Sequence, residues 1–228
     1  MEKFINSFDD IKLGRKIGGG SCSEIYEFSG GVYFKKFCED YCDLTDPINI
    51  EFLETIRTIS EIDFLPYIIR ATDIYRNDML LFGYTMDEVS ADILDDVSDD
   101  VLVCDIMSGF ENLKPGIRKL SDNFVKTEDI GGDNILYNGN MYLLDLDLSL
   151  VDKRYIPDEL YENTRRSVFR SLFKRVTGSN FTDIVKYDEY GHYIEKIVDN
   201  CSNYVDSDIK TIAQFKGAYQ KTYKKTTS

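Results

Sequence analysis

Short apolar and aromatic runs, separated by glycine-rich turns, dominate the first forty residues. The runs Leu13–Ile17, Ile25–Phe28 and Val32–Phe37 have the β-branched and aromatic composition of strands. Ser29-Gly30-Gly31 turns the chain before the third run. The cluster Gly18-Gly19-Gly20-Ser21 cannot continue an ordinary strand, and its missing side chains would let backbone N–H groups approach a phosphate. We therefore expect three successive strands with an open first turn.

The pattern becomes helical from Pro47 to Ile59 and then returns to strands. The apolar positions of this helix are Ile50, Phe52, Leu53, Ile56 and Ile59. Two further strands are expected at Ile68–Tyr75 and Met79–Met86, around the turn Arg76-Asn77-Asp78. The stretch from Asp87 to Asp100 is acidic and has no strand pattern, so a boundary between two parts of the chain is expected near Asp87–Ser90.

The second part of the chain is mostly helical by pattern. Val101–Ser121 predicts a helix that Lys114-Pro115-Gly116 should break or kink. Asp158–Val176 predicts a helix that stops at Gly178. Two more amphipathic segments, Asp183–Val198 and Asp206–Tyr219, precede a polar tail, Gln220–Ser228, that is expected to fray.

One hairpin interrupts these helices. Asn138-Gly139 suits a type I′ turn between the apolar segments Ile135–Tyr137 and Met141–Leu144. Folding at this turn brings together Asp129, Asn134 and Asp145, whose oxygens could hold Mg²⁺. Since 41 of the 228 residues are Asp or Glu, a chance cluster on a solvated surface is the alternative.

Composition narrows the possible partners. The hydrophobic fraction of 43% indicates a folded globule, and the net charge of −14 disfavours nucleic acid and anionic membranes as partners. The chain shows no signal-peptide pattern and no apolar run of transmembrane length, so we expect a cytoplasmic protein without membrane insertion. The five scattered cysteines fit free thiols in a reducing compartment better than a zinc site.

Several motifs, in this order, resemble the protein kinase family. Ile17–Ile25 is similar to its glycine-rich loop, with Ser23 at the third glycine position, and Val32–Lys35 is similar to the strand that ends in the phosphate-binding lysine. Tyr84–Val89 resembles the hinge, and Thr127–Asn134 matches the spacing of the catalytic loop. Leu144-Asp145-Leu146-Asp147 stands at the Asp-Phe-Gly position. The likeness spans roughly Leu13 to Gly178.

The resemblance implies an α+β, two-lobed protein kinase-like fold. Residues 1–88 would form a lobe with a small antiparallel β-sheet and one helix. Residues 89–228 would form a mostly helical lobe with the catalytic hairpin. The two lobes together would make one kinase-like domain.

The resemblance also implies a role for each matching residue. Ile17 and Ile25 would cover the adenine ring of ATP, and the backbone of Asp87 to Val89 would bond adenine. Gly18, Gly19 and Gly20 would lie over the phosphates. Lys35 would steady the α- and β-phosphates, while Asn134 and Asp145 would hold Mg²⁺. Asp129 would accept or orient the proton of the attacking hydroxyl.

The chain also departs from the family pattern. Glu128 replaces the arginine that reads a phosphorylated activation loop, so activity is expected without that modification. Gly131 replaces the second lysine of protein Ser/Thr kinases, and Asp147 replaces the glycine of the metal motif. The glutamate partner of Lys35 stays unassigned. Asn49 occupies its position, whereas helical spacing directs Glu51 and Glu54 toward solvent.

Three functions remain open. The first is a compact, bacterial-type protein kinase. The second is a small-molecule kinase of the aminoglycoside or choline phosphotransferase type, a class that lacks the second lysine and often carries an Asp-x-Asp metal motif like Asp145-Leu146-Asp147. The third is a pseudokinase that acts as an interaction module. Lys35, Asp129, Asn134 and Asp145 favour an enzyme, and we expect a protein or small-molecule hydroxyl as acceptor. The acidic stretch 87–100 favours a cationic acceptor, unless it is simply solvated surface.

Overall fold

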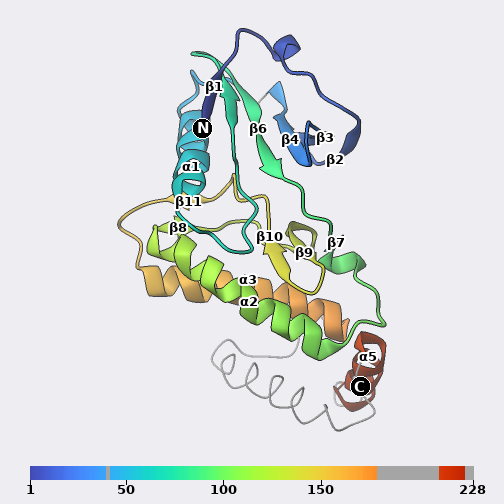
Figure 1. The fold of residues 1–228 in the computed structure, drawn as a ribbon. Helices are drawn as coiled ribbons and strands as arrows, with labels where there is room; N and C mark the ends of the chain where they lie inside the picture. Colours follow the sequence, from blue (N-terminus) through green and yellow to red (C-terminus); the bar gives the residue numbers. More distant parts are fainter. Residues whose placement is uncertain (40–41, 179–210, 224–228) are drawn as a thin grey trace.

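The computed structural model describes residues 1–39, 42–178 and 211–223. In these ranges the chain is an α+β protein with a six-stranded mixed sheet and four α-helices. The sheet and helix α1 occupy one end of the molecule, and helices α2, α3 and α5 lie at the other end (Figure 1). A small hairpin, β9 and β10, lies between them (Figure 1).

The six-stranded sheet has the order β1-β5-β6-β4-β3-β2. Its strands are β1 (Glu2–Phe4), β2 (Lys16–Gly19), β3 (Ser23–Glu27), β4 (Val32–Phe37), β5 (Ile74–Arg76) and β6 (Leu81–Asp87). All neighbours are antiparallel except β1, which runs parallel to β5. The predicted purely antiparallel sheet is therefore wrong at this edge. A three-residue strand has too few positions to show an alternating pattern.

Two predicted strands have different bounds. Strand β2 begins at Lys16 and continues through Gly18 and Gly19, with a shift in register between Lys16 and Gly18. The expected strand at residues 68–75 is reduced to Ile74–Arg76. Its first residues pair elsewhere, since the N–H of Ile69 donates to the carbonyl of Leu143 over 2.9 Å. This contact connects the sheet end of the molecule to the hairpin.

Helix α1 (Pro47–Glu61) confirms the predicted helix. Asp46 caps it by accepting a bond of 2.9 Å from the N–H of Ile48, and Pro47 suits the first turn. Four of the predicted apolar positions are buried, namely Phe52, Leu53, Ile56 and Ile59. Ile50 is 45% exposed, so its assignment to the buried face was wrong.

Helix α2 (Val103–Asp122) runs without a break through Pro115, contrary to the prediction. Pro115 and Glu111 both lie on the exposed face, where water can satisfy the carbonyl that lacks its helical partner. The opposite face is fully buried at Phe110, Leu113 and Ile117. Burial of this apolar face supports the helix across the proline.

Helix α3 (Pro157–Thr177) matches its prediction and ends at Gly178, whose φ of 68° is left-handed. Helix α5 (Ile212–Tyr223) overlaps the last predicted segment and continues into the tail that was expected to fray, as far as Tyr223. The predicted helix 183–198, residues 206–210 and the tail from 224 onward lie outside the described residues.

The acidic stretch contains a strand that the pattern did not indicate. Strand β7 (Asp92–Ile93) pairs with β9 (Ile135–Tyr137), which pairs with β10 (Met141–Leu143), and the short helix η3 (Leu94–Asp96) follows β7. The turn between β9 and β10 has three residues, and only Gly139 among them has a positive φ, so the type I′ prediction is wrong. A two-stranded sheet joins β8 (Val125–Lys126) to β11 (Leu150–Val151).

Two main apolar clusters form the core. The larger one joins α2, α3 and the hairpin, and the second lies between α1 and the sheet. Among the described helices, none has both the length and the apolar character needed to cross a lipid bilayer.

Candidate functional site

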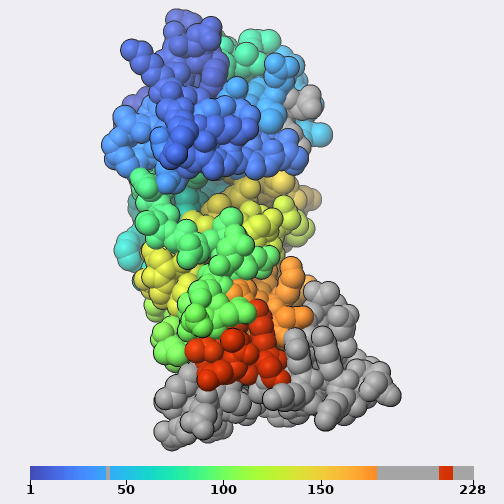
Figure 2. All heavy atoms as spheres, turned by 90° about the vertical axis from the view of Figure 1, so that its right-hand side faces the viewer, coloured from blue at the N-terminus to red at the C-terminus, as the bar shows by residue number. Residues whose placement is uncertain are grey.

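A cleft of about 530 Å³ opens between the sheet and the hairpin region. Residues 1–37 lie above the segments that follow residue 87 (Figure 2). These later segments form the other side of the cleft. The cleft is lined by Gly19, Gly20, Ser21, Cys22, Ser23, Ile25, Lys35, Phe37, Phe52, Tyr84, Met86, Ile93, Asp129, Asp133, Asn134, Leu144, Asp145, Asp147 and Leu148. Its walls thus come from segments more than one hundred residues apart in the chain.

Lys35 lies on the floor of this cleft. It belongs to β4, pairs in register with Tyr84 of β6, and is only 5% exposed. Its ammonium group donates to Asp147 over 2.5 Å and also to Asp145. Burial favours the neutral amine, but the charges of Asp147 and Asp145 outweigh it and raise the pKa of Lys35 above its usual value. The two aspartates therefore hold Lys35 in its ammonium form.

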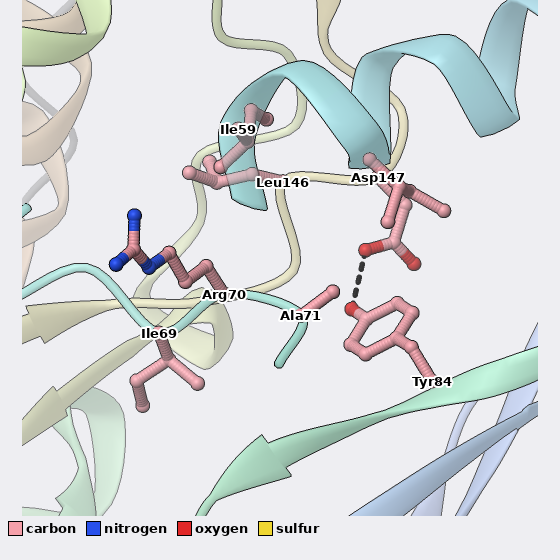
Figure 3. A pocket seen from close by; sticks show the side chains of 8 residues that line it. Ile59, Ile69, Arg70, Ala71, Tyr84, Leu146 and Asp147 are labelled. Carbon is pink, nitrogen blue, oxygen red and sulfur yellow. Dashed lines mark hydrogen bonds between the residues drawn. The ribbon is translucent and has the colours of Figure 1, made fainter. Parts of the chain in front are cut away.

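Asp147 is the most enclosed acid of the cleft, with 6% exposure. One carboxylate oxygen accepts from Lys35, and the other accepts from the Tyr84 hydroxyl over 2.5 Å (Figure 3). Burial raises the pKa of Asp147, while the neighbouring Lys35 opposes this shift. The guanidinium of Arg70 points away from Asp147 and donates to the carbonyl of Ile62 (Figure 3).

The loop before the hairpin has a fixed shape. Asp129 has a φ of 51°, a left-handed conformation that side chains rarely adopt. The side-chain amide of Asn134 donates to the carbonyl of Asp129 over 2.8 Å, and the N–H of Leu144 donates to the carbonyl of Asn134 over 3.1 Å. These bonds join the loop to the segment that carries Asp145.

Thr127 adds an anchor to helix α3. Its hydroxyl lies 2.6 Å from the hydroxyl of Thr164. Gly131 and Gly132 lie close to two carboxylates of the same region. A Cβ at Gly131 would come within 2.2 Å of the Asp133 carboxylate, and one at Gly132 would come within 2.3 Å of the Asp95 carboxylate. Both carboxylates are the ends of exposed side chains that can move, so a larger residue at either position would displace an aspartate side chain and not the backbone.

The oxygen donors of the cleft suit a magnesium ion that a nucleotide helps to bind. Asp145, with a φ of 61°, has a side chain that is 42% exposed, and Asn134 retains a free amide oxygen to offer once its NH₂ group has bonded Asp129. Mg²⁺ commonly takes one or two protein oxygens, water and substrate phosphates. In the described part of the chain, no three His, Cys, Asp or Glu side chains form a metal cluster on their own.

The cleft contains most of the sequence-predicted site residues. Gly19, Gly20, Ile25, Lys35, Asp129, Asn134 and Asp145 all line it. Ile17, Gly18, Asp87 and Val89 do not. Ile17 is 41% exposed, and at the predicted hinge the N–H of Glu88 already donates to the carbonyl of Gly31 over 3.1 Å. Adenine contacts at 87–89 stay a prediction.

Two residues of the site had no assigned role from sequence, Asp147 and Tyr84. A charged lysine in an apolar strand is unfavourable unless its charge is paired, so Lys35 indicated that an acid must lie beside it. The helix α1 does not supply it, because Glu51 and Glu54 are exposed and the side chain of Asn49 donates to the carbonyl of Asp43 over 3.0 Å.

Comparison with known proteins adds no assignment. No protein-family model matches the chain, and a search of curated proteins finds no significant match.

Proposed function

We propose that this protein is an ATP- and Mg²⁺-dependent phosphotransferase with the two-lobed architecture of the protein kinase superfamily. The observation that carries the proposal is the presence in one cleft of Lys35, Asp129, Asn134 and Asp145 together with the glycine turn between β2 and β3. These are the residue types that phosphoryl transfer uses for positioning and for charge stabilisation.

The glycine turn suits a phosphate-covering role. A Cβ at Gly20 would meet no atom within 4 Å, so this side of the turn is open to an incoming group. Gly19, by contrast, has a φ of 147°, and a Cβ there would lie 2.7 Å from the carbonyl oxygen of Ser23. Gly19 shapes the turn, and Gly20 leaves room for the phosphates.

Each charged group of the cleft then has a distinct task. Lys35 donates to phosphate oxygens from a buried position and neutralises part of their charge. Asp129 accepts or orients the proton of the acceptor hydroxyl from an exposed position at the mouth. Asn134 and Asp145 are the ligands of Mg²⁺, which would offset the negative charge that develops on the phosphates.

The acceptor can belong to either of two chemical classes. A minimal protein kinase remains the first candidate. A small-molecule kinase is the second, and one observation favours it. Lys35 is the only Lys or Arg among the residues that line the described cleft, and Gly131 stands at the position where protein Ser/Thr kinases carry a second lysine.

The hypothesis that the acidic stretch 87–100 attracts a cationic acceptor has less support. Asp99 forms ion pairs with Arg175 at 2.6 Å and with Lys216 at 2.9 Å, and Asp95 lies 3.8 Å from Lys174. Part of the acidic stretch is therefore paired with α3 and α5 within the fold.

The deciding experiment incubates the protein with γ-labelled ATP and Mg²⁺. Label is then sought on the protein itself, on a generic protein, and on aminoglycosides or choline. The Asp129→Asn variant is the negative control. Asp63→Asn, an exposed residue just after α1 that does not line the cleft, controls for the substitution itself. Transfer by the native protein that Asp129→Asn loses would support the proposal, whereas no transfer to any acceptor and no nucleotide binding would overturn it.

A further inference from the structure

The two aspartates of the Asp145-Leu146-Asp147 segment both bond Lys35 but differ in burial and in their other partners. Asp147 is enclosed, and both of its carboxylate oxygens accept short bonds from protein donors. Asp145 has a 42% exposed side chain and, within the described residues, hydrogen-bonds to Lys35 alone. Of the two carboxylates, the exposed one has more room for a metal ion and the water molecules that Mg²⁺ keeps.

We propose that Asp147 is the positioning residue for Lys35 and not a metal ligand, and that Tyr84 fixes Asp147 in that role. This inference rests on the proposed phosphotransferase function. The same segment would then supply the metal ligand, Asp145, and the anchor of the phosphate-binding lysine, two residues apart. An ordinary strand would place residues 145 and 147 on the same face. Asp145, however, has a left-handed φ of 61°, so the segment is not extended there and the two side chains differ in exposure.

The surroundings of Asp147 suit an anchor. Figure 3 shows its carboxylate bonded to the Tyr84 hydroxyl at a small cavity that Ile59 and Leu146 also line. This cavity has a volume of only about 10 Å³, so on this side at most one water molecule could reach the carboxylate. On its other side Asp147 lines the cleft, where one of its oxygens is bonded to Lys35. A strand residue, Tyr84, and a buried apolar wall therefore restrict the rotamer of Asp147 and, through it, the position of Lys35.

In this arrangement helix α1 supplies no charged partner of Lys35. Glu51 and Glu54 are exposed, and Glu54 pairs with Arg57 on the helix surface. The contribution of α1 to the anchor is apolar, through Ile56 and Ile59, which line the small cavity beside Asp147.

The test compares Asp147→Asn, Asp145→Asn and Tyr84→Phe with the native chain. For Asp147→Asn we expect kcat to fall about 10²-fold, the effect of a misplaced group, with the Mg²⁺ concentration for half-maximal activity unchanged. For Asp145→Asn we expect that Mg²⁺ requirement to rise. Tyr84→Phe keeps the Lys35 contact and should lose less than Asp147→Asn. A Mg²⁺ requirement that rises with Asp147→Asn would make Asp147 a ligand and overturn the inference.

A melting experiment without nucleotide gives a second, independent readout. Lys35→Met leaves the buried Asp147 without a cation, and Asp147→Leu leaves the buried Lys35 with only the exposed Asp145 as its partner, so each should lower Tm more than the double variant does. The pair Lys35→Met and Asp145→Asn should show no such recovery, because Asp145 is exposed. Losses that simply add for Lys35 and Asp147 would overturn the anchor. If the native chain neither binds nor transfers phosphate from ATP while the melting cycle shows the coupling, the proposed function fails and Asp147 is a structural partner of Lys35 only.

Discussion

Burial sorts the charged side chains of the cleft into two kinds. Lys35 and Asp147 are enclosed and bonded to each other, whereas Asp129 and Asp145 lie at the surface. A buried charge needs fixed partners, while an exposed carboxylate can exchange water for a metal ion or a substrate proton. Under the proposed function, Asp147 would hold Lys35 in position for the phosphates. Asp129 would act on the acceptor hydroxyl, and Asp145 would bind Mg²⁺.

At this scale the sequence was informative about residue types but not about pairing. Lys35 in an apolar strand required a partner, and Asp129, Asn134 and Asp145 were expected at one edge of the hairpin. Asp147 was identified as a departure from the protein kinase motif and as part of an Asp-x-Asp metal motif of small-molecule kinases, not as the partner of Lys35. Its partnership with Lys35 depends on how β4, β6 and the loop after β10 lie together, which no local pattern encodes.

The roles of Asp129 and Asp145 give the first prediction. Asp129→Asn should keep nucleotide affinity while kcat falls about 10²–10⁴-fold, the usual worth of general-base assistance. Asp145→Asn should weaken Mg²⁺·ATP binding and abolish transfer together, because the lost ligand serves both the ground state and the transition state. Steady-state kinetics and calorimetric titration measure both quantities. An undiminished kcat in Asp129→Asn would show that the catalytic-loop assignment is wrong.

Among the elements, strand β1 is the least predictable from sequence and depends on one side chain. Glu2 accepts bonds from Arg57 of α1 and from Arg76 of β5, the latter over 2.9 Å. Glu2 thus joins the first strand to both the helix and the sheet. The longer elements, α1 and α3, were predictable because their apolar periodicity extends over four turns or more, whereas β1, β7 and β11 have only two or three residues each.

The Glu2 contacts predict a pH-dependent stability of this edge. The bond from Arg57, and then that from Arg76, lowers the pKa of Glu2 below its ordinary value of 4.5 despite partial burial. The stabilisation is therefore complete above about pH 4.5 and is lost as the pH falls through the folded-state value. Charged hydrogen bonds that are partly exposed contribute about 1 kcal/mol, so Glu2→Gln should lower Tm by about 2–4 °C at pH 7.

The difference between native protein and Glu2→Gln should shrink as the pH falls below about 4.5 and through the lowered pKa of Glu2, because protonation removes the charge that the two arginines bind. Thermal melts at pH 7 and pH 3 measure it, with Glu61→Gln, an exposed glutamate at the end of α1, as the matched control. A loss of Tm that is the same at both pH values would mean that shape, and not charge, holds β1.

The segment 149–157 is a second element whose structure bears on regulation. Its strand β11 pairs with β8, and the N–H of Asp152 donates to the carbonyl of Phe124 over 3.2 Å. Glu128, at the position of the phosphate-reading arginine, pairs with Lys126 at 2.5 Å. The segment is thus held by backbone pairing, and the position expected to read a phosphate on it carries a glutamate that is already paired with Lys126.

We therefore predict that phosphorylation of this segment is not needed for activity. Of its two hydroxyl side chains, Ser149 is only 2% exposed, which leaves Tyr155 as the accessible one. Protein treated with phosphatase, and the Tyr155→Phe variant, should both keep kcat within about twofold of untreated protein, where surface substitutions usually lie. A tenfold loss after phosphatase, absent when the phosphatase is inhibited, would contradict this prediction.

On the scale of the whole molecule, the cleft exists only because distant segments meet. Its sides come from the β2–β3 turn, from β4 and β6, and from the loops on either side of the hairpin. The order and spacing of motifs anticipated most of this set, because each motif keeps its own local geometry. The residues expected to contact adenine, Ile17 and the backbone of 87–89, were not predicted as well, because they do not line the cleft.

A ligand that bridges these two ends should stabilise the entire fold, which gives the last prediction. ATP with Mg²⁺ at about 100 times its Kd should add roughly 2.7 kcal/mol to the free energy of unfolding, or about 5–11 °C in Tm for a chain of this size. Mg²⁺ without ATP should add little, because two protein oxygens leave the coordination shell to water. In the Asp145→Asn variant the shift with Mg²⁺·ATP should shrink toward that with ATP alone. Scanning calorimetry on the three mixtures measures these differences. A native chain whose Tm stays constant at saturating millimolar Mg²⁺·ATP has no nucleotide site in the cleft, and the fold would then serve as an interaction module.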